Sequence, residues 1–163
     1  SELEKVLPIF RERYKNRVSS QEAYIYRGVE GVKNYMRDIL RDIKEVYTIG
    51  GKLSWLDEKL ENFSKKFFEE ATKKKIKFNI LFDNEVSQRA KADIKIFGEG
   101  NFKFLPPKYS TDSAVDIFND YVVTFTGMRL KKIDIDVTVF VLKDKKLADS
   151  YRKWFEFMWD NLK

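Results

Sequence analysis

A glycine-lysine segment in the first third of the chain has the residue types of an anion-binding loop. It follows a short apolar run and precedes a stretch with helical spacing. At such a junction, free backbone amides and the helix dipole favour a phosphate or carboxylate. A tight turn into the start of a helix is the alternative interpretation. The candidate ligand-binding residues here are Gly50, Gly51, Lys52 and Ser54.

This segment is not a nucleotide-hydrolysing P-loop. Such a loop requires a glycine five residues before its Gly-Lys pair and a Ser or Thr directly after the lysine. The chain has Val46 and Leu53 at those two positions. The P-loop class is therefore excluded, while a simpler anion-binding loop stays open.

A polar pair follows the next apolar run, residues 76–82. Asp83 and Asn84 come directly after that run. Because ligands in open parallel sheets bind beyond the carboxyl ends of the strands, this pair should share an edge with residues 50–52. Asp83 can accept hydrogen bonds from a sugar or another polar ligand, although Asp-Asn is also ordinary turn or N-cap chemistry. Asp112, in a later loop, completes the candidate ligand set.

Asp134 and Asp136 form a second kind of candidate, a pair of carboxylates at strand spacing. Both side chains should face the same side of a strand. Together with Asp116 they define an alternative function, a Mg²⁺-dependent phosphoryl-transfer or nuclease activity. An outer strand with a solvated polar face explains the pair as well.

Composition excludes several classes of site. The 163 residues include no histidine and no cysteine, which removes His-dependent triads, His- or Cys-ligated zinc and disulfides. We expect no metal site and no cofactor. The 32 basic residues exceed the 26 acidic ones, so direct nucleic-acid binding is a further alternative. No apolar run reaches the roughly 20 residues of a membrane span, and we expect a cytoplasmic protein without membrane contact.

The elements that must position these residues follow an α/β order. Alternating strands and helices predict a parallel core with flanking helices. The hydrophobic spacing predicts strands at residues 22–27, 45–49 and 76–82, with helices at 29–44 and 54–71 between them. Two short strands at 94–97 and 102–105, a hairpin at 114–126, a long strand at 133–142 and an amphipathic helix from residue 145 follow.

The N-terminal residues carry an apolar stripe. Leu3, Leu7, Phe10 and Tyr14 recur at alternating four- and three-residue spacing, the pattern of a short coiled-coil seam. Pro8 should kink this helix or start it. The stripe either packs on its own domain or forms the contact of a homodimer.

Three short segments carry a family resemblance. They are residues 26–32 (YRGVEGV), residues 117–120 (IFND) in the hairpin turn, and residues 155–159 (FEFMW) in the last helix. In this order, and over nearly the whole chain, the sequence resembles the regulatory domain of archaeal TrmB-family transcription regulators.

That resemblance implies a domain organisation and a set of partners. In the family, an N-terminal winged helix-turn-helix binds DNA, a helical linker dimerises, and the next domain has an α/β phospholipase-D-like fold. Residues 1–20 would then be the tail of the dimerisation linker, and residues 21–163 a single regulatory domain without its winged helix. The implied partners are a second copy of the chain, DNA through the missing domain, and a small-molecule effector.

The resemblance also bears on catalysis. Phospholipase D enzymes use a His-x-Lys-x-x-x-x-Asp motif, and the corresponding hairpin here has Asp112, Ala114 and Asn119. None of the three catalytic side chains is present. The implied function is a non-enzymatic effector-binding and dimerisation domain of a transcription regulator, with no catalytic residues.

Overall fold

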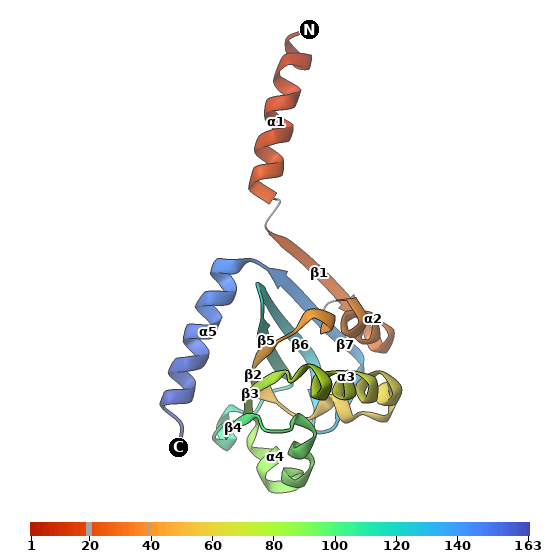
Figure 1. The fold of residues 1–163 in the computed structure, drawn as a ribbon, viewed down its shortest axis with the longest axis vertical. Coiled ribbons are helices and arrows are strands. Elements are labelled where there is room, and N and C mark those ends of the chain that lie inside the picture. Colours follow the sequence, from red (N-terminus) through yellow and green to blue (C-terminus); the bar gives the residue numbers. More distant parts are fainter. Residues whose placement is uncertain (19–20, 39) are drawn as a thin grey trace.

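The computed structural model describes residues 1–18, 21–38 and 40–163, and for residues 12–18 it describes the backbone only. Within these ranges, seven strands form one mixed sheet in the order β1-β7-β6-β5-β2-β3-β4 (Figure 1). The strands are β1 (Glu22–Arg27), β2 (Glu45–Gly51), β3 (Lys77–Phe82), β4 (Asn101–Phe104), β5 (Ser113–Phe118), β6 (Tyr121–Arg129) and β7 (Lys132–Lys143).

Helices cover both faces of the sheet. Figure 1 shows α2 and α3 on one side and α5 on the other, which confirms the predicted α/β class with flanking helices. The α-helices are α1 (Glu2–Val18), α2 (Gly28–Asp38), α3 (Glu61–Lys74), α4 (Asn84–Arg89) and α5 (Lys145–Asp160).

The parallel part of the sheet differs from the predicted one. Strands β2, β3 and β4 are parallel neighbours, whereas β1 lies at the far edge and pairs antiparallel with β7. The prediction that the first three strands form the parallel core was wrong for β1. Successive strands joined by a helix usually lie side by side, but here the long C-terminal strand β7 occupies the position next to β1.

Strand β3 is buried on both faces. Ile80 and Phe82 pack in the large core beneath α2 and α3. Leu81 points the other way and packs with Ala148 and Phe155 of α5. Buried strands of this kind are typical of sheets that carry helices on both sides.

Three predicted elements have different boundaries because short 3₁₀ turns replace regular structure. The helix predicted at 29–44 ends as α2 at Asp38 and is followed by a turn at Leu40–Asp42. The helix predicted from Ser54 starts with turns at Ser54–Leu56 and Glu58–Leu60. The segment predicted as a strand at 94–97 lies within the 3₁₀ helix Lys91–Phe97, where the three-residue spacing of Ile94 and Phe97 matches the 3₁₀ repeat.

The C-terminal hairpin, long strand and helix confirm their predictions. Strands β5 and β6 pair from Ser113 to Phe118, and Asn119 at the turn has a left-handed φ of 50°, as hairpin turns require. Helix α5 begins after Asp144, whose side chain accepts a hydrogen bond from the Leu147 amide at 2.8 Å.

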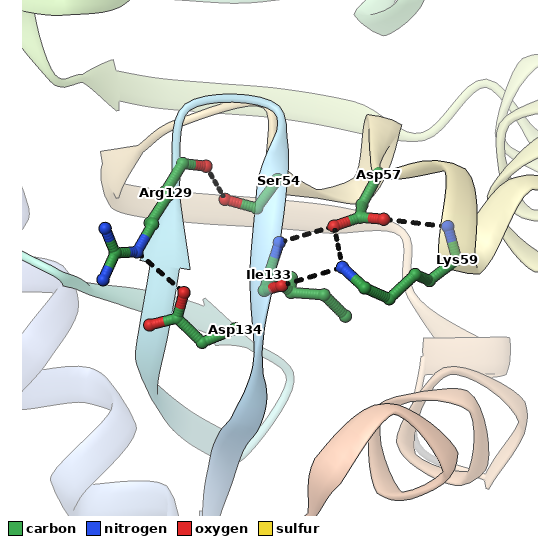
Figure 2. A network of polar contacts seen from close by, with 6 residues as sticks. All are labelled: Ser54, Asp57, Lys59, Arg129, Ile133 and Asp134. Atoms are coloured by element: carbon green, nitrogen blue, oxygen red, sulfur yellow. Dashed lines mark hydrogen bonds and ion pairs between the residues drawn. The ribbon is translucent and has the colours of Figure 1, made fainter.

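A network of hydrogen bonds and ion pairs links residues 54–60 to the tip of the β6–β7 hairpin (Figure 2). Asp57 accepts hydrogen bonds at 2.8 Å from the amides of Ile133 and Lys59, and the Lys59 ammonium donates to the Ile133 carbonyl at 3.2 Å. The Ser54 hydroxyl donates to the Arg129 carbonyl at 2.7 Å. Burial alone would raise the pKa of Asp57, but these hydrogen bonds hold it below its ordinary value. The charged network therefore holds residues 54–60 against the β6–β7 hairpin.

Helix α1 stands away from the sheet in Figure 1. It begins at Glu2, so Pro8 lies inside it and does not start it. Leu3, Leu7 and Phe10 are 69%, 40% and 66% exposed. The side chain of Tyr14, the fourth member of the predicted stripe, lies outside the described residues. Among the described residues, no helix is both long and apolar enough to cross a membrane.

Candidate ligand-binding site

Two sequence-predicted site residues meet as a buried ion pair. Lys52 directly follows β2 and Asp83 directly follows β3, and these strands are parallel neighbours whose ends lie together. The Lys52 ammonium is 3.0 Å from an Asp83 carboxylate oxygen, and each side chain is only 1% exposed. The predicted convergence of the two strand ends therefore occurs, but it occurs inside the protein.

The Lys52 ammonium is surrounded by acceptor groups of the chain itself. It donates to the Gly50 carbonyl at 2.7 Å and to the Ser113 carbonyl of β5. The Asp83 carboxylate is its third neighbour, at ion-pair distance. Neither carboxylate oxygen of Asp83 has a hydrogen bond of good geometry among the described residues, so the contact with Lys52 neutralises charge without a well-aligned hydrogen bond. An anion would have to displace Asp83 to reach this lysine.

The glycine at position 50 makes this arrangement possible. Its φ of +77° lies in the left-handed region, where residues with a Cβ are strained. A Cβ built there would lie 3.0 Å from the Ser113 carbonyl oxygen and 3.4 Å from the Lys52 ammonium. Gly50 therefore lets β2 and β5 approach closely enough for the lysine to bridge them.

The other predicted ligand residues are placed differently. Gly51 is buried beside Lys52, and Ser54 is buried but commits its hydroxyl to the Arg129 carbonyl. Asn84 is half-buried at the start of α4, and the side chain of Asp112 is exposed on its loop. The structure thus gathers Gly50, Gly51, Lys52 and Asp83 at one place, and does not bring Asn84 and Asp112 into the same buried cluster.

An internal cavity of about 50 Å³ adjoins this ion pair. A volume of this size is enough for a few water molecules or one very small polar group. Its lining combines aromatic and aliphatic side chains with a few polar ones. The polar wall consists of Thr48, Lys52, Ser54 and Asp116, and the aromatic wall includes Trp55, Phe67, Phe78 and Phe125.

Asp116 is the ionisable group of this cavity that keeps free acceptor capacity. It faces Thr48 across the β2–β5 pair, and the Thr48 hydroxyl donates to it at 2.6 Å. Burial raises the pKa of Asp116 to about 6, and the hydrogen bond from Thr48 opposes that rise. Near neutral pH, a carboxylate with spare acceptor positions therefore borders the cavity.

Tyr35 adds a second unsatisfied group to the same region. Its hydroxyl is buried and has no hydrogen-bond partner among the described residues. Its ring contacts Trp55 and Phe125, which also line the cavity. Burial, and secondly the charge of Asp116, raise the pKa of Tyr35 well above its ordinary value, so the hydroxyl remains a proton donor. A donor and an acceptor without full partners thus lie around one aromatic interior.

The carboxylate triad proposed from the sequence does not form. Asp134 pairs with the Arg129 guanidinium at 2.7 Å on the hairpin, while Asp116 is buried against Thr48. Across residues 1–18, 21–38 and 40–163, no group of three or more acidic side chains is placed to hold a metal ion. The hypothesis of a site built from Asp116, Asp134 and Asp136 therefore has no geometric support.

Sequence reasoning did not identify Asp116 and Thr48 as one cavity wall. A usable signal was present in β5, where Asp116 alternates with Ala114 and Phe118, both of which face the core. A carboxylate at an inward-facing strand position costs free energy unless it has a partner or a role. The period-2 pattern thus marks Asp116 as an interior residue.

Comparison with known proteins shows which solved structures have a similar fold. No family model matches the sequence, and no curated protein matches it. Several solved structures are similar at low sequence identity. The archaeal chromatin protein TrmBL2, described as showing a novel mode of DNA binding, is 16% identical with a TM-score of 0.56, covering 99% of this chain and 69% of its own.

Two further similar structures belong to enzyme families. Nuc from Salmonella typhimurium, a phospholipase D family member, is 12% identical with a TM-score of 0.62, covering 88% of this chain and 97% of its own. Phosphatidylserine synthase from Haemophilus influenzae is 13% identical with a TM-score of 0.52, covering 85% of this chain and 36% of its own. The chain therefore has a phospholipase-D-like fold.

These neighbours also correct one prediction. The prediction from the sequence that the chain is not an enzyme is contradicted by these neighbours, because a phospholipase D family member and a synthase share its fold. That conclusion rested on one motif at one hairpin. The absence of that motif at Asp112, Ala114 and Asn119 removes the catalytic groups of phospholipase D at those positions and says nothing of other chemistry.

Proposed function

We propose that this chain is the effector-binding and dimerisation domain of a TrmB-family transcription regulator, whose DNA-binding winged helix lies elsewhere in the protein. The observation that carries the proposal is the internal cavity bordered by Asp116, a buried carboxyl that accepts a hydrogen bond from Thr48 and keeps further acceptor capacity. The likeness to TrmBL2 over 99% of this chain supports the choice of a DNA-associated class. Residues 21–163 would form the regulatory domain, and residues 1–20 the end of the dimerisation linker.

The effector would bind where the cavity meets the strand ends of β2 and β3. Asp116 would accept hydrogen bonds from it, and the aromatic wall would hold its apolar part. Gly50, Gly51, Lys52, Ser54 and Asp83 would shape the polar end of this site. Asn84 and Asp112 would contact only a ligand that extends to the surface. A ligand larger than the 50 Å³ cavity requires the wall of α3 to move outward.

A thermal-shift screen of polar metabolites tests effector binding. A ligand that binds only the folded state, at about 100 times its Kd, adds about 2.7 kcal/mol to the free energy of unfolding. For a domain of this size that corresponds to a rise in Tm of roughly 5–10 °C. We expect Asp116→Asn to abolish the rise and the exposed Asp136→Asn to preserve it. A rise that survives in Asp116→Asn would place the ligand elsewhere, and no rise with any metabolite would contradict effector binding.

Dimerisation is proposed through the apolar stripe of α1. Leu3, Leu7 and Phe10 are exposed and recur at seam spacing, which fits a helix that packs against a second copy. We expect Leu7→Glu with Phe10→Glu to raise the dimer dissociation constant at least about 100-fold, because each buried side chain contributes roughly 1.5–3 kcal/mol. Multi-angle light scattering over a concentration series measures this change.

The matched control for the dimer is Lys5→Glu, a charge change on another side of the same helix. It should leave the oligomeric state unaltered. A wild-type chain that stays monomeric at high concentration contradicts the proposal. Dimerisation that persists in the double variant would mean that a different surface forms the contact.

A further inference from the structure

A groove of about 320 Å³ lies between α2 and α3, on the face of the sheet opposite α5 (Figure 1). Its volume falls at the lower end of the roughly 300–1,000 Å³ range of small-molecule sites. Met36 and Leu40 are buried at its base, and three half-buried side chains continue the apolar surface. The apolar lining is Met36, Leu40, Phe63, Phe67 and Ile76.

The rim of this groove is mainly cationic. Arg37, Arg41, Lys66 and Lys74 line it, against the single acidic residue Glu70. The α2–α3 groove therefore has an excess of three positive charges in its lining, from 4 − 1. Such a combination of an apolar floor and a basic rim is complementary to a molecule with an apolar body and an anionic head.

Neighbouring acids neutralise this rim only in part. Arg37 contacts Asp38 at 3.2 Å and Arg41 contacts Asp42 at 3.7 Å, both as exposed pairs. Exposed pairs of this kind are weak and exchange readily with other anions. Among the described residues, no carboxylate lies within ion-pair distance of Lys66. Lys66 is therefore the cation on this rim with the greatest capacity for an external anion.

Lys74 sets one end of the groove. Its ammonium donates to the Arg41 carbonyl at 3.1 Å and so joins the end of α3 to the turn after α2. An ammonium has two further donors after this bond. The anionic head of a ligand can thus lie at Lys66, on the side away from Glu70, while its apolar part lies over Phe63 and Phe67.

We propose that the α2–α3 groove binds a small anionic amphiphile, specifically an unbranched chain of medium length that ends in a carboxylate. A nucleic acid would use the basic rim but not the half-buried phenylalanines, and a protein helix would need a longer surface than a ligand-sized groove. The groove shares Leu40 and Phe67 with the lining of the effector cavity at Asp116. Its polar residues are different, and the proposed ligand has a different chemistry.

Isothermal titration calorimetry with decanoate, below its micelle-forming concentration, tests the groove. We expect saturable one-to-one binding, with octanoate about 15-fold weaker because each buried CH₂ contributes about fourfold. Decyltrimethylammonium has the same chain and the opposite charge, and should bind at least about tenfold more weakly. Equal binding of the two decyl compounds, or the absence of saturable decanoate binding, overturns the proposal.

Two variants locate the site. Lys66→Glu should weaken decanoate binding about tenfold or more. Lys65→Glu makes the same change one residue away, where the side chain lines a different hollow together with Glu61 and Glu69, and should leave the affinity unchanged. Both side chains are on the surface of α3, and thermal unfolding should confirm that both variants fold. If the two variants weaken binding equally, the amphiphile does not occupy this groove.

Discussion

Replacing Lys52 with methionine is expected to lower the free energy of unfolding by about 3–5 kcal/mol. The substitution removes the ammonium and leaves the Asp83 carboxylate 1% exposed, charged and without a partner of opposite sign. It also leaves the Gly50 and Ser113 carbonyls without their donor. Urea denaturation followed by circular dichroism measures the loss.

A second substitution shows whether the loss comes from the stranded charge. Lys52→Met combined with Asp83→Leu should recover part of the stability, because replacing both members of a buried pair is less harmful than removing one. The control is Lys145→Met, which breaks an exposed pair with Asp149 and should leave the unfolding midpoint nearly unaltered. If Lys52→Met is no more harmful than this control, the pair is not buried as described.

Replacing Asp116 with asparagine is expected to stabilise the domain above pH 6, by up to about 3 kcal/mol. In the folded state burial raises the pKa of this carboxyl from 3.8 to about 6. The folded chain therefore binds more protons than the unfolded chain between these values. Stability from this group is fully present below pH 3.8 and is lost as the pH rises through about 6. Asparagine does not ionise, and its amide carbonyl can still accept the Thr48 hydrogen bond.

The pH profile distinguishes this cause from a general improvement in packing. Wild-type and Asp116→Asn proteins should unfold at similar urea concentrations near pH 4 and differ most near pH 8. Asp136→Asn, an exposed substitution, provides the matched profile. A constant difference across the whole pH range would contradict a buried ionised carboxyl at position 116.

The local parts of the fold were predictable from the sequence, and the long-range parts were not. The Asn119-Asp120 turn and the amphipathic spacing of α5 are encoded in short segments, so both could be predicted. The place of β1 depends on β7, which lies at the other end of the chain, and no local pattern identifies that partner. Residues 94–97 were ambiguous because a short apolar run fits a strand or a 3₁₀ turn.

The candidate site also has a part that was predictable from the sequence and a part that was not. The meeting of Lys52 with Asp83 follows from two parallel strand ends, and the sequence predicted it. That the lysine would also bond to the Ser113 carbonyl was not predictable, because this carbonyl comes from a residue 61 positions later. The exposed stripe of Leu3, Leu7 and Phe10 was predictable as a stripe, whereas its distance from the sheet depends on tertiary structure.

The pairing of β1 with β7 also constrains how the chain can fold during synthesis. The side chain of Gln21 next to β1 bonds to Asp144 at 2.7 Å, across 123 residues of sequence. Strand β1 leaves the ribosome first among the strands, yet its hydrogen-bonding partner is made last. Sheets closed by such distant contacts form slowly, and an unpaired strand is prone to association with other chains. The nascent chain therefore exposes β1 through most of translation, and chaperone demand should fall only when β7 has emerged.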